Sequence, residues 1–425
     1  MLIMFKIGNF LSFNNDRELS LELSKPVKEL KEDNTFITAR YELLKSAVIY
    51  GANAGGKSNF LKAMDTMRWL IINSSKNLQA KESLRLIPFK LSTDTLNEPC
   101  RFEIIILIDD IKYRYGFEAD KKEIKSEWLF MAKKIKEDPL FIREKDEIQV
   151  FSRFKEGKGL EERTRDNALF LSVCAQFNGA ISEKILEWFF NFNVISGLQD
   201  KHYLNYSANM FLNNDNERSK ILDLVKKADL GISNINVETS KLTEDKLPAN
   251  MPDDLKKTLL GKDVMSILTF HKLADKNGAN VGSVAFDFEN EESEGTKKYF
   301  RLSGPIIDTL INGKILVIDE LDARLHPILI REIVKLFNSK ITNPSNAQLI
   351  FATHDTNLLN LNIFRRDQIW FAEKDNSDAT DLYSLSEYRL PKGNVRNDAS
   401  FEKDYIQGRY GAIPFTGDFE SLWCK

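Results

Sequence analysis

The sequence is poor in the residues that build disulfide frameworks and metal clusters. Its 425 residues include three cysteines and four histidines. Cys100, Cys174 and Cys424 are far apart and form no CxxC pair, which excludes a local zinc ribbon. A chain of this size without paired cysteines is typical of a reducing compartment, so we expect a cytoplasmic protein.

Net charge and long apolar runs are also missing. The 60 Lys and Arg residues nearly balance the 63 Asp and Glu residues, which argues against a surface that binds nucleic acid through overall positive charge. No stretch approaches the ~20 apolar residues of a membrane span, and the first apolar run stops at Lys6. Glycine (20) and proline (11) are scarce, which excludes a long disordered chain. A soluble, folded protein without a membrane partner is expected.

The hydrophobic pattern divides the chain into three parts. Strand patterns, one amphipathic helix and an antiparallel β-meander fill the first part, and the middle part is polar with a helical pattern. In the last part short apolar strands alternate with helices, which is typical of a parallel sheet covered by helices. The predicted fold class is α/β, with a mixed sheet, a β-meander and a largely helical insertion. The predicted domains are residues 1–134 and 291–425, the two halves of one head, and residues 135–290, the insertion.

Residues 51–58 carry the strongest functional signal. The segment GANAGGKS lies between a predicted strand and a predicted helix, and it satisfies the P-loop (Walker A) pattern GxxxxGK[ST]. Such glycines let backbone N–H groups surround a phosphate, and the helix dipole adds positive charge. Lys57 would reach the β- and γ-phosphates of ATP, and Ser58 would hold Mg²⁺. The predicted nucleotide-binding residues of this segment are Gly51, Asn53, Ala54, Gly55, Gly56, Lys57, Ser58 and Asn59.

Two later strand ends carry groups that suit ATP hydrolysis. The apolar run ILVI ends in Asp319 and Glu320, and ligands of parallel sheets bind at the carboxyl ends of strands. Asp319 would therefore bind Mg²⁺ through water beside Ser58, and Glu320 would act as general base for the attacking water. His354 ends the next apolar run, where its imidazole would contact the γ-phosphate. Lys57, Glu320 and His354 are the predicted catalytic residues of an ATPase.

Together these residues resemble a known family. Asn53 in the P-loop, Asp319-Glu320, Leu321-Asp322 and His354 resemble the ABC-type ATPase heads of DNA-repair and chromosome-maintenance proteins. With the segments SEGTKKYF, IDELDARLHP and FATHDTNLL, the chain is more closely similar to bacterial overcoming-lysogenization-defect-like and abortive-infection ATPases. The resemblance covers roughly residues 1–130 and 290–425. It implies an ABC-type P-loop ATPase head.

The resemblance also implies that two heads enclose ATP, each offering a signature motif to the P-loop of the other. Ser293 and Gly295 are the favoured signature residues, because the spacing to Asp319 accommodates a full helix whose N-terminus would face the γ-phosphate. The segment Ser303-Gly304 remains an alternative, since the proline that follows it suits a helix start. Asp322 would contact the second copy.

A glutamine between P-loop and signature normally senses Mg²⁺ in this family. Gln79, Gln149 and Gln176 are all available, and the sequence does not select one. An intrinsic Toprim-type nuclease is not expected, because too few residues follow Glu373. The acidic residues after Glu373 then form a solvated hairpin loop. Residues 403–414, aromatic and basic, either dock a partner or pack on the head.

The predicted function is a slow ATP-driven switch. The chain would form a homodimer or higher homo-oligomer and regulate a separately encoded effector, a nuclease in anti-phage defence according to the family resemblance. The alternative is a repair or chromosome-maintenance ATPase that clamps DNA, with nucleic acid bound directly or through the complex. Its basic groove would come from Lys121, Lys122, Lys125, Lys133, Lys134 and Lys136.

Overall fold

The computed structural model describes residues 1–38, 40–145, 147–244, 247, 251–390, 393–394 and 400–414, so Cys424 lies outside it. The chain separates into two compact units. The first unit consists of Met1–Gly197, Leu310–Asp322 and Ile330–Lys425, and the second unit of Leu198–Thr309 and Ala323–Leu329.

The first unit contains a six-stranded sheet with the strand before the P-loop near its centre. The strand order is β11-β15-β16-β5-β17-β18, and every neighbouring pair is parallel except β17 and β18. All residues of β5 and β16 are buried, which explains why both strands are apolar after their first residue. The predicted α/β fold with a mixed sheet is confirmed. The strands are β5 (Ser46–Tyr50), β11 (Phe192–Ser196), β15 (Ile315–Asp319), β16 (Gln348–Ala352), β17 (Ile369–Lys374) and β18 (Thr380–Ser384).

The predicted antiparallel meander forms the second sheet of the first unit. Seven strands pair in the order β10-β9-β8-β7-β6-β1-β2, so the N-terminal hairpin joins the meander through β1 and β6. The strands are β1 (Leu2–Gly8), β2 (Arg17–Ser20), β6 (Cys100–Ile108), β7 (Ile111–Ala119), β8 (Ile124–Ala132), β9 (Asp138–Glu144) and β10 (Glu147–Val150).

Helix α2 (Lys57–Asn73) connects the two sheets through a shared core. Its buried residues, among them Phe60, Met64 and Met67, belong to one hydrophobic cluster with strand residues from both sheets. Ala47 and Ile49 of β5 join this cluster because alternate residues of a strand point to the same face. The helix that follows the P-loop is therefore held rigidly at its apolar side.

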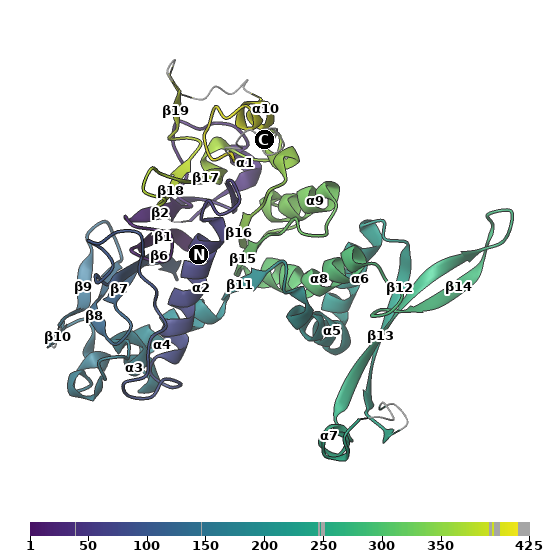
Figure 1. Cartoon of the computed structure of the whole chain (residues 1–425), viewed down its shortest axis with the longest axis horizontal. Coiled ribbons are helices and arrows are strands. Elements are labelled where there is room, and N and C mark those ends of the chain that lie inside the picture. The colour runs from purple at the N-terminus through teal and green to yellow at the C-terminus, as the bar shows by residue number, and fades with distance from the viewer. Residues whose placement is uncertain are drawn as a thin grey trace, which may run out of the picture. The chain divides into compact units, whose positions relative to one another are not determined.

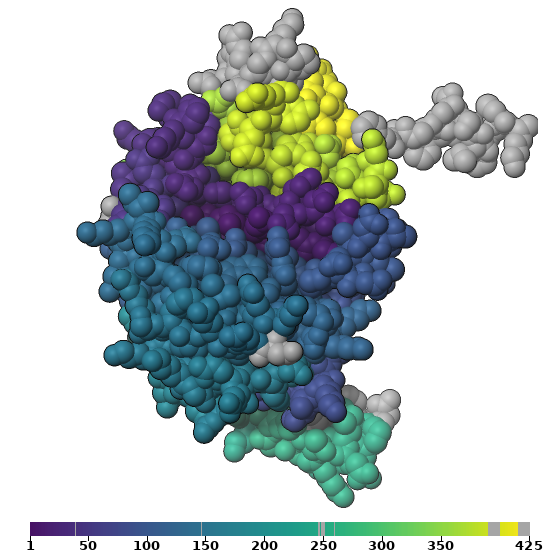
Figure 2. Space-filling model, turned by 90° about the vertical axis from the view of Figure 1, so that its left-hand side faces the viewer, coloured from purple at the N-terminus to yellow at the C-terminus, as the bar shows by residue number. Residues whose placement is uncertain are grey.

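Segments that are far apart in the sequence meet on one face of the first unit (Figure 2). The yellow-green C-terminal residues lie against the purple N-terminal residues there. Arg17 of β2 forms an ion pair with Asp381 of β18, and the Thr380 N–H donates to the Ser12 carbonyl at 2.7 Å. The β17–β18 hairpin is thus fastened to the N-terminal hairpin.

The structure differs from the predicted insertion at residues 135–290. Strands β9 and β10 continue the meander, and β11 pairs with β15 in the parallel sheet, so the first unit extends to Gly197. The second unit also contains the three-stranded sheet β12-β13-β14, which the sequence did not predict and which reaches beyond α5, α6 and α8 (Figure 1). Both faces of its outer part are exposed, so its residues lack the apolar alternation that marks a strand. The strands are β12 (Ile232–Lys241), β13 (Asp263–Ala274) and β14 (Asn280–Asp287).

The other elements are mostly short. Among the described residues we find no helix suited to crossing a membrane. The first unit also contains β3 (Thr35–Ile37), β4 (Glu42–Leu44), α1 (Lys31–Asn34), α3 (Phe170–Gln176), α4 (Ala180–Phe190) and α10 (Phe401–Ile406). The second unit contains α5 (Leu204–Asn213), α6 (Asp215–Lys227) and α7 (Asp253–Leu259). Two helices, α8 (Glu294–Asn312) and α9 (Pro327–Asn338), begin in the second unit and end in the first.

A buried carboxylate joins the meander to α3. Glu127 of β8 accepts hydrogen bonds from the Tyr115 hydroxyl at 2.9 Å, the Leu171 N–H at 3.0 Å and the Phe170 N–H at 2.6 Å. Burial raises the pKa of Glu127, while Arg143 and the three donors lower it. The carboxylate therefore satisfies the first N–H groups of a buried helix, which have no partner within the helix.

We predict that Glu127→Ala lowers the free energy of unfolding by about 3–5 kcal/mol, because it leaves buried donors and the Arg143 cation uncompensated. Urea denaturation measures the change. Glu147→Ala on the exposed edge strand β10 is the control, with an expected loss below about 0.5 kcal/mol. Equal losses in the two variants would show that Glu127 has no special role.

Candidate functional site

The P-loop leaves β5 at Tyr50 and enters α2 at Lys57. Gly56 has φ 109°, a left-handed conformation that favours glycine, and a Cβ placed there would lie 2.1 Å from Thr380 Oγ1. The turn is closed by the Gly55 N–H, which donates to the Ala52 carbonyl at 3.0 Å. The first N–H groups of α2 have no preceding turn to bond, so this end of the helix suits an anion.

The two predicted metal-binding residues meet. The Ser58 hydroxyl donates to Asp319 Oδ1 at 3.1 Å, although 261 residues separate them. Burial raises the pKa of Asp319, and the Ser58 hydroxyl and the Lys57 ammonium oppose this rise. A hydroxyl and a carboxylate are the hard oxygen ligands that suit Mg²⁺ together with phosphate and water. Within the described ranges we find no cluster of three His, Cys, Asp or Glu side chains that could bind a metal.

The P-loop lysine is folded into the loop. Lys57 Nζ donates to the carbonyls of Gly51 at 2.7 Å and Ala52 at 3.1 Å. Burial lowers the pKa of Lys57 to about 8, and the Asp319 carboxylate with its acidic neighbours partly opposes this decrease. The amine therefore lies beside the phosphate cradle, held by carbonyls that a phosphate would replace.

The remaining predicted residues of the first unit lie at the same sheet edge. Glu320 has a left-handed φ of 52°, and Gly197 approaches so closely that a Cβ on it would lie 2.1 Å from the Glu320 carbonyl oxygen. The His354 N–H donates to Asp322 Oδ2 at 3.1 Å, whereas Asp322 Oδ1 is buried without a hydrogen-bond partner among the described residues. Burial and the nearby Lys57 lower the pKa of His354, while the carboxylates of Asp322, Glu320 and Asp319 oppose this decrease.

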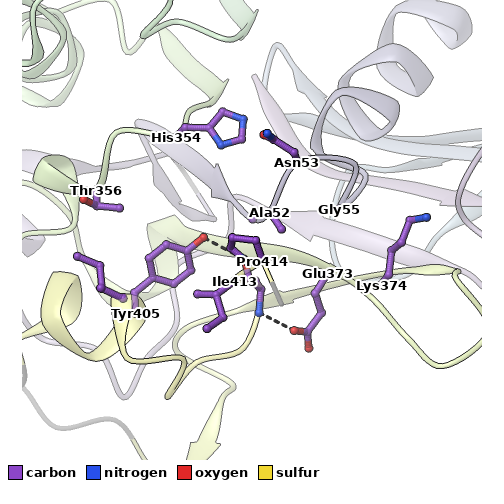
Figure 3. Close-up of a pocket in the computed structure, with 13 residues that line it drawn as sticks. Ala52, Asn53, Gly55, His354, Thr356, Glu373, Lys374, Tyr405, Ile413 and Pro414 are labelled. Carbon is purple, nitrogen blue, oxygen red and sulfur yellow. Dashed lines mark hydrogen bonds between the residues drawn. The ribbon is translucent and has the colours of Figure 1, made fainter. Parts of the chain in front are cut away.

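A pocket of about 690 Å³ lies beside the first half of the P-loop (Figure 3). The Ala412 N–H donates to Glu373 Oε2 at 2.6 Å, and the Tyr405 hydroxyl donates to the Ala412 carbonyl at 3.0 Å. Residues 403–414 therefore pack on the first unit, one of the two roles considered for them. The lining residues are Gly51, Ala52, Asn53, Gly55, His354, Thr356, Glu373, Lys374, Tyr405, Ile406, Ala412, Ile413 and Pro414.

Sequence reasoning missed two residues that support the P-loop. Thr380 Oγ1 lies 3.1 Å from the Gly55 carbonyl and 2.8 Å from Ser12 Oγ. Ser12 also accepts a hydrogen bond from Asn59 Nδ2 at 2.9 Å. These residues come from the N-terminal segment and β18, and no local motif marks them, so only long-range sheet topology would reveal their role.

The acidic residues after Glu373 lie in and after the β17–β18 turn. Asp375 Oδ1 accepts the N–H groups of Ser377 at 2.8 Å and Ala379 at 3.0 Å. Asp381 is paired with Arg17. These carboxylates therefore shape a hairpin, as predicted. Gln79, Gln149 and Gln176 do not line the pocket described above, and none is distinguished as the Mg²⁺-sensing residue.

Comparison with known proteins shows the family. A family model described as "AAA domain, putative AbiEii toxin, Type IV TA system" matches residues 46–360, which include the P-loop, Ser293, Asp319, Glu320 and His354. The chain belongs to this AAA-domain family. No curated protein gives a significant match.

Solved structures are similar at low sequence identity. The SMC head domain from Thermotoga maritima has 13% identity and a TM-score of 0.41, covering 90% of this chain and 98% of that one. An SMC head bound to the C-terminal winged-helix domain of ScpA has 10% identity and a TM-score of 0.43, covering 91% of this chain and 98% of that one.

In this AAA-domain protein the two candidate signature segments lie in different local environments. Ser293 precedes α8 and caps it, because its Oγ accepts the Thr296 N–H at 3.1 Å. Ser303 lies within α8, is buried, and donates to the Phe300 carbonyl at 2.6 Å. The segment Ser303-Gly304 therefore does not begin a helix, which was the requirement for the alternative.

We predict that Gly56→Ala weakens ATP binding by about tenfold or more, because the new Cβ would be strained and would collide with Thr380. Isothermal titration calorimetry with Mg-ATP measures the affinity. The control is Gly159→Ala, where φ is +81° and no atom lies within 4 Å of a new Cβ. A similar weakening in the control would assign the effect to general strain and contradict the prediction.

Proposed function

We propose that this AAA-domain protein binds Mg-ATP and hydrolyses it slowly. The observation that carries the proposal is the 3.1 Å contact between Ser58 and Asp319. It brings the end of β15 to the P-loop, so that a phosphate cradle, a hydroxyl and a carboxylate occupy one sheet edge. This donor set matches the requirements of a nucleoside triphosphate with Mg²⁺.

Each residue at this edge has a chemical role in the proposal. Lys57 exchanges its loop carbonyls for the β- and γ-phosphates, and Ser58 and Asp319 hold Mg²⁺. When bound, Mg²⁺ neutralises charge on the transferring phosphoryl group. Glu320 orients the attacking water and takes its proton, and His354 contacts the γ-phosphate through its imidazole ring.

We further propose that ATP joins two copies of the chain. According to the family resemblance, Ser293 and Gly295 of one copy contact the γ-phosphate of the ATP that is bound to the P-loop of the other copy. Asp322 lies at the contact between the two copies. Because ADP lacks the γ-phosphate, ATP would favour the associated state through contacts that ADP does not make. The protein would then be a homodimer or a higher homo-oligomer, and its association would depend on whether ATP or ADP is bound.

The biological role that we propose is regulation of a separately encoded effector protein, a nuclease, in anti-phage defence in the cytoplasm. The family description, with its toxin and its toxin–antitoxin system, supports this setting. A slow ATPase suits a regulator, because the ATP-bound state must persist long enough to act on its partner.

The alternative, a DNA-clamping repair or maintenance ATPase, finds less support. Lys121 and Lys122 precede β8, whereas Lys133, Lys134 and Lys136 follow it. Since β8 has nine residues, the two groups lie about 25–30 Å apart along the strand direction, so they do not form one compact cluster. Lys125 is paired with Asp120 and Glu123. Duplex binding with a steep salt dependence would favour the alternative.

We predict that Glu320→Gln forms a persistent dimer with Mg-ATP, because it retains ATP binding but lacks the base for hydrolysis. Light scattering after size-exclusion chromatography gives the mass, and phosphate release should fall by about 100-fold or more. The wild-type dimer should dissociate once its ATP has been hydrolysed.

Lys57→Ala is the matched control, since it removes the phosphate ligand and should stay monomeric with Mg-ATP. If the mass of Glu320→Gln is the same with and without Mg-ATP, the ATP-dependent dimer is disproved. Undiminished phosphate release from Glu320→Gln would disprove the role of Glu320 as base.

A further inference from the structure

The residue before Ser293 is anchored to the sheet of the second unit. The Glu292 side chain is only 6% exposed. Its Oε1 accepts the Thr269 hydroxyl at 2.5 Å and lies 2.7 Å from His271 Nε2. Thr269 and His271 are alternate residues of β13, so both side chains lie on one face of the strand. The chemistry proposed for ATP does not use this carboxylate.

The same face of the sheet continues outward from Glu292. The His271 ring packs on Phe286 of β14 with centroids 4.4 Å apart, and Phe286 is the cross-strand partner of Thr269. Farther along this face lie Leu273 and Val284, which are 47% and 38% exposed. Contacts between neighbouring side chains therefore connect an exposed apolar surface with the Glu292 carboxylate.

On its other side Glu292 adjoins the start of α8. Ser293 caps this helix through the Thr296 N–H, and Glu294 pairs with Lys297 at 3.1 Å and with Arg324 at 3.2 Å. The backbone that carries Ser293 thus runs directly from the β13 anchor into the helix. A change in the position of β13 would move Ser293, because only one peptide bond separates it from Glu292.

We propose that Glu292 is a positioning residue that ties the signature segment to β13 and couples the β12–β14 sheet to ATP-dependent dimerisation. This inference rests on the proposed function, in which Ser293 acts on ATP held by the second copy. Since Glu292 acts through Ser293, it affects association of the two copies and does not affect ATP binding to the P-loop of a single copy.

The test uses the full chain with Glu320→Gln as parent, so that hydrolysis does not interfere. Glu292→Ala and Thr269→Val each remove the hydrogen bond between carboxylate and strand, and each should weaken the Mg-ATP dimer by about tenfold in sedimentation velocity. Glu292→Gln should restore dimerisation to within about threefold, because its amide oxygen still accepts the Thr269 hydroxyl. The affinity of dilute monomer for a fluorescent ATP analogue should change less than about twofold.

Two matched controls should dimerise like the parent. Glu291→Gln makes the same charge change one residue away, where the carboxylate accepts the Asp287 N–H at 2.5 Å. Thr239→Val makes the same isosteric change on β12, at an exposed position.

The outcomes separate the inference from the proposed function. If the parent does not dimerise with Mg-ATP, the composite site is wrong, and the role of Glu292 in it is wrong as well. If the parent dimerises and both Glu292→Ala and Thr269→Val dimerise equally well, the positioning role alone is overturned. If ATP affinity of the monomer falls in parallel with dimerisation, the role is merely structural, which also overturns it. If Glu292→Ala does not fold, dimerisation of Thr269→Val alone tests the positioning role.

Discussion

The parallel register of β15, β16 and β5 is the constraint on which the site depends. Leu349 pairs with both Leu316 and Ser46, so the three strands end at one edge. This alignment brings Asp319 to the Ser58 hydroxyl. A shift of one residue in any of these pairings would turn the strand side chains to the opposite face, and the carboxylate would no longer meet the P-loop. The buried apolar faces that determine the strand register therefore also determine that Asp319 lies beside the P-loop.

The parts of the site with a strong local signal could be predicted from sequence. The P-loop needs glycines and a lysine within eight residues, and Asp319 and His354 each follow an uninterrupted apolar strand. Ser12 and Thr380 could not be predicted, because their support of the P-loop arises from pairing between distant segments. Strands β12–β14 were also missed, since a sheet exposed on both faces has no apolar alternation.

The residues proposed to bind phosphate and the signature residues Ser293 and Gly295 lie in different units of the molecule. The P-loop, Asp319 and His354 belong to the first unit, whereas Ser293 caps a helix of the second unit. In the proposed assembly each unit contributes to a different ATP site, so the state of the β12–β14 sheet and the state of the nucleotide become linked. Such linkage is reciprocal, because a partner that favours the ATP-bound dimer is itself bound more tightly by it.

The central claim, that Ser58 and Asp319 hold the metal that accompanies ATP, is tested most directly by ATP affinity with Mg²⁺ and with EDTA. The account predicts that Mg²⁺ tightens ATP binding to the wild type by about tenfold or more, and that Ser58→Ala loses most of this gain while binding metal-free ATP as before. An equal gain from Mg²⁺ in the wild type and in Ser58→Ala would contradict the account.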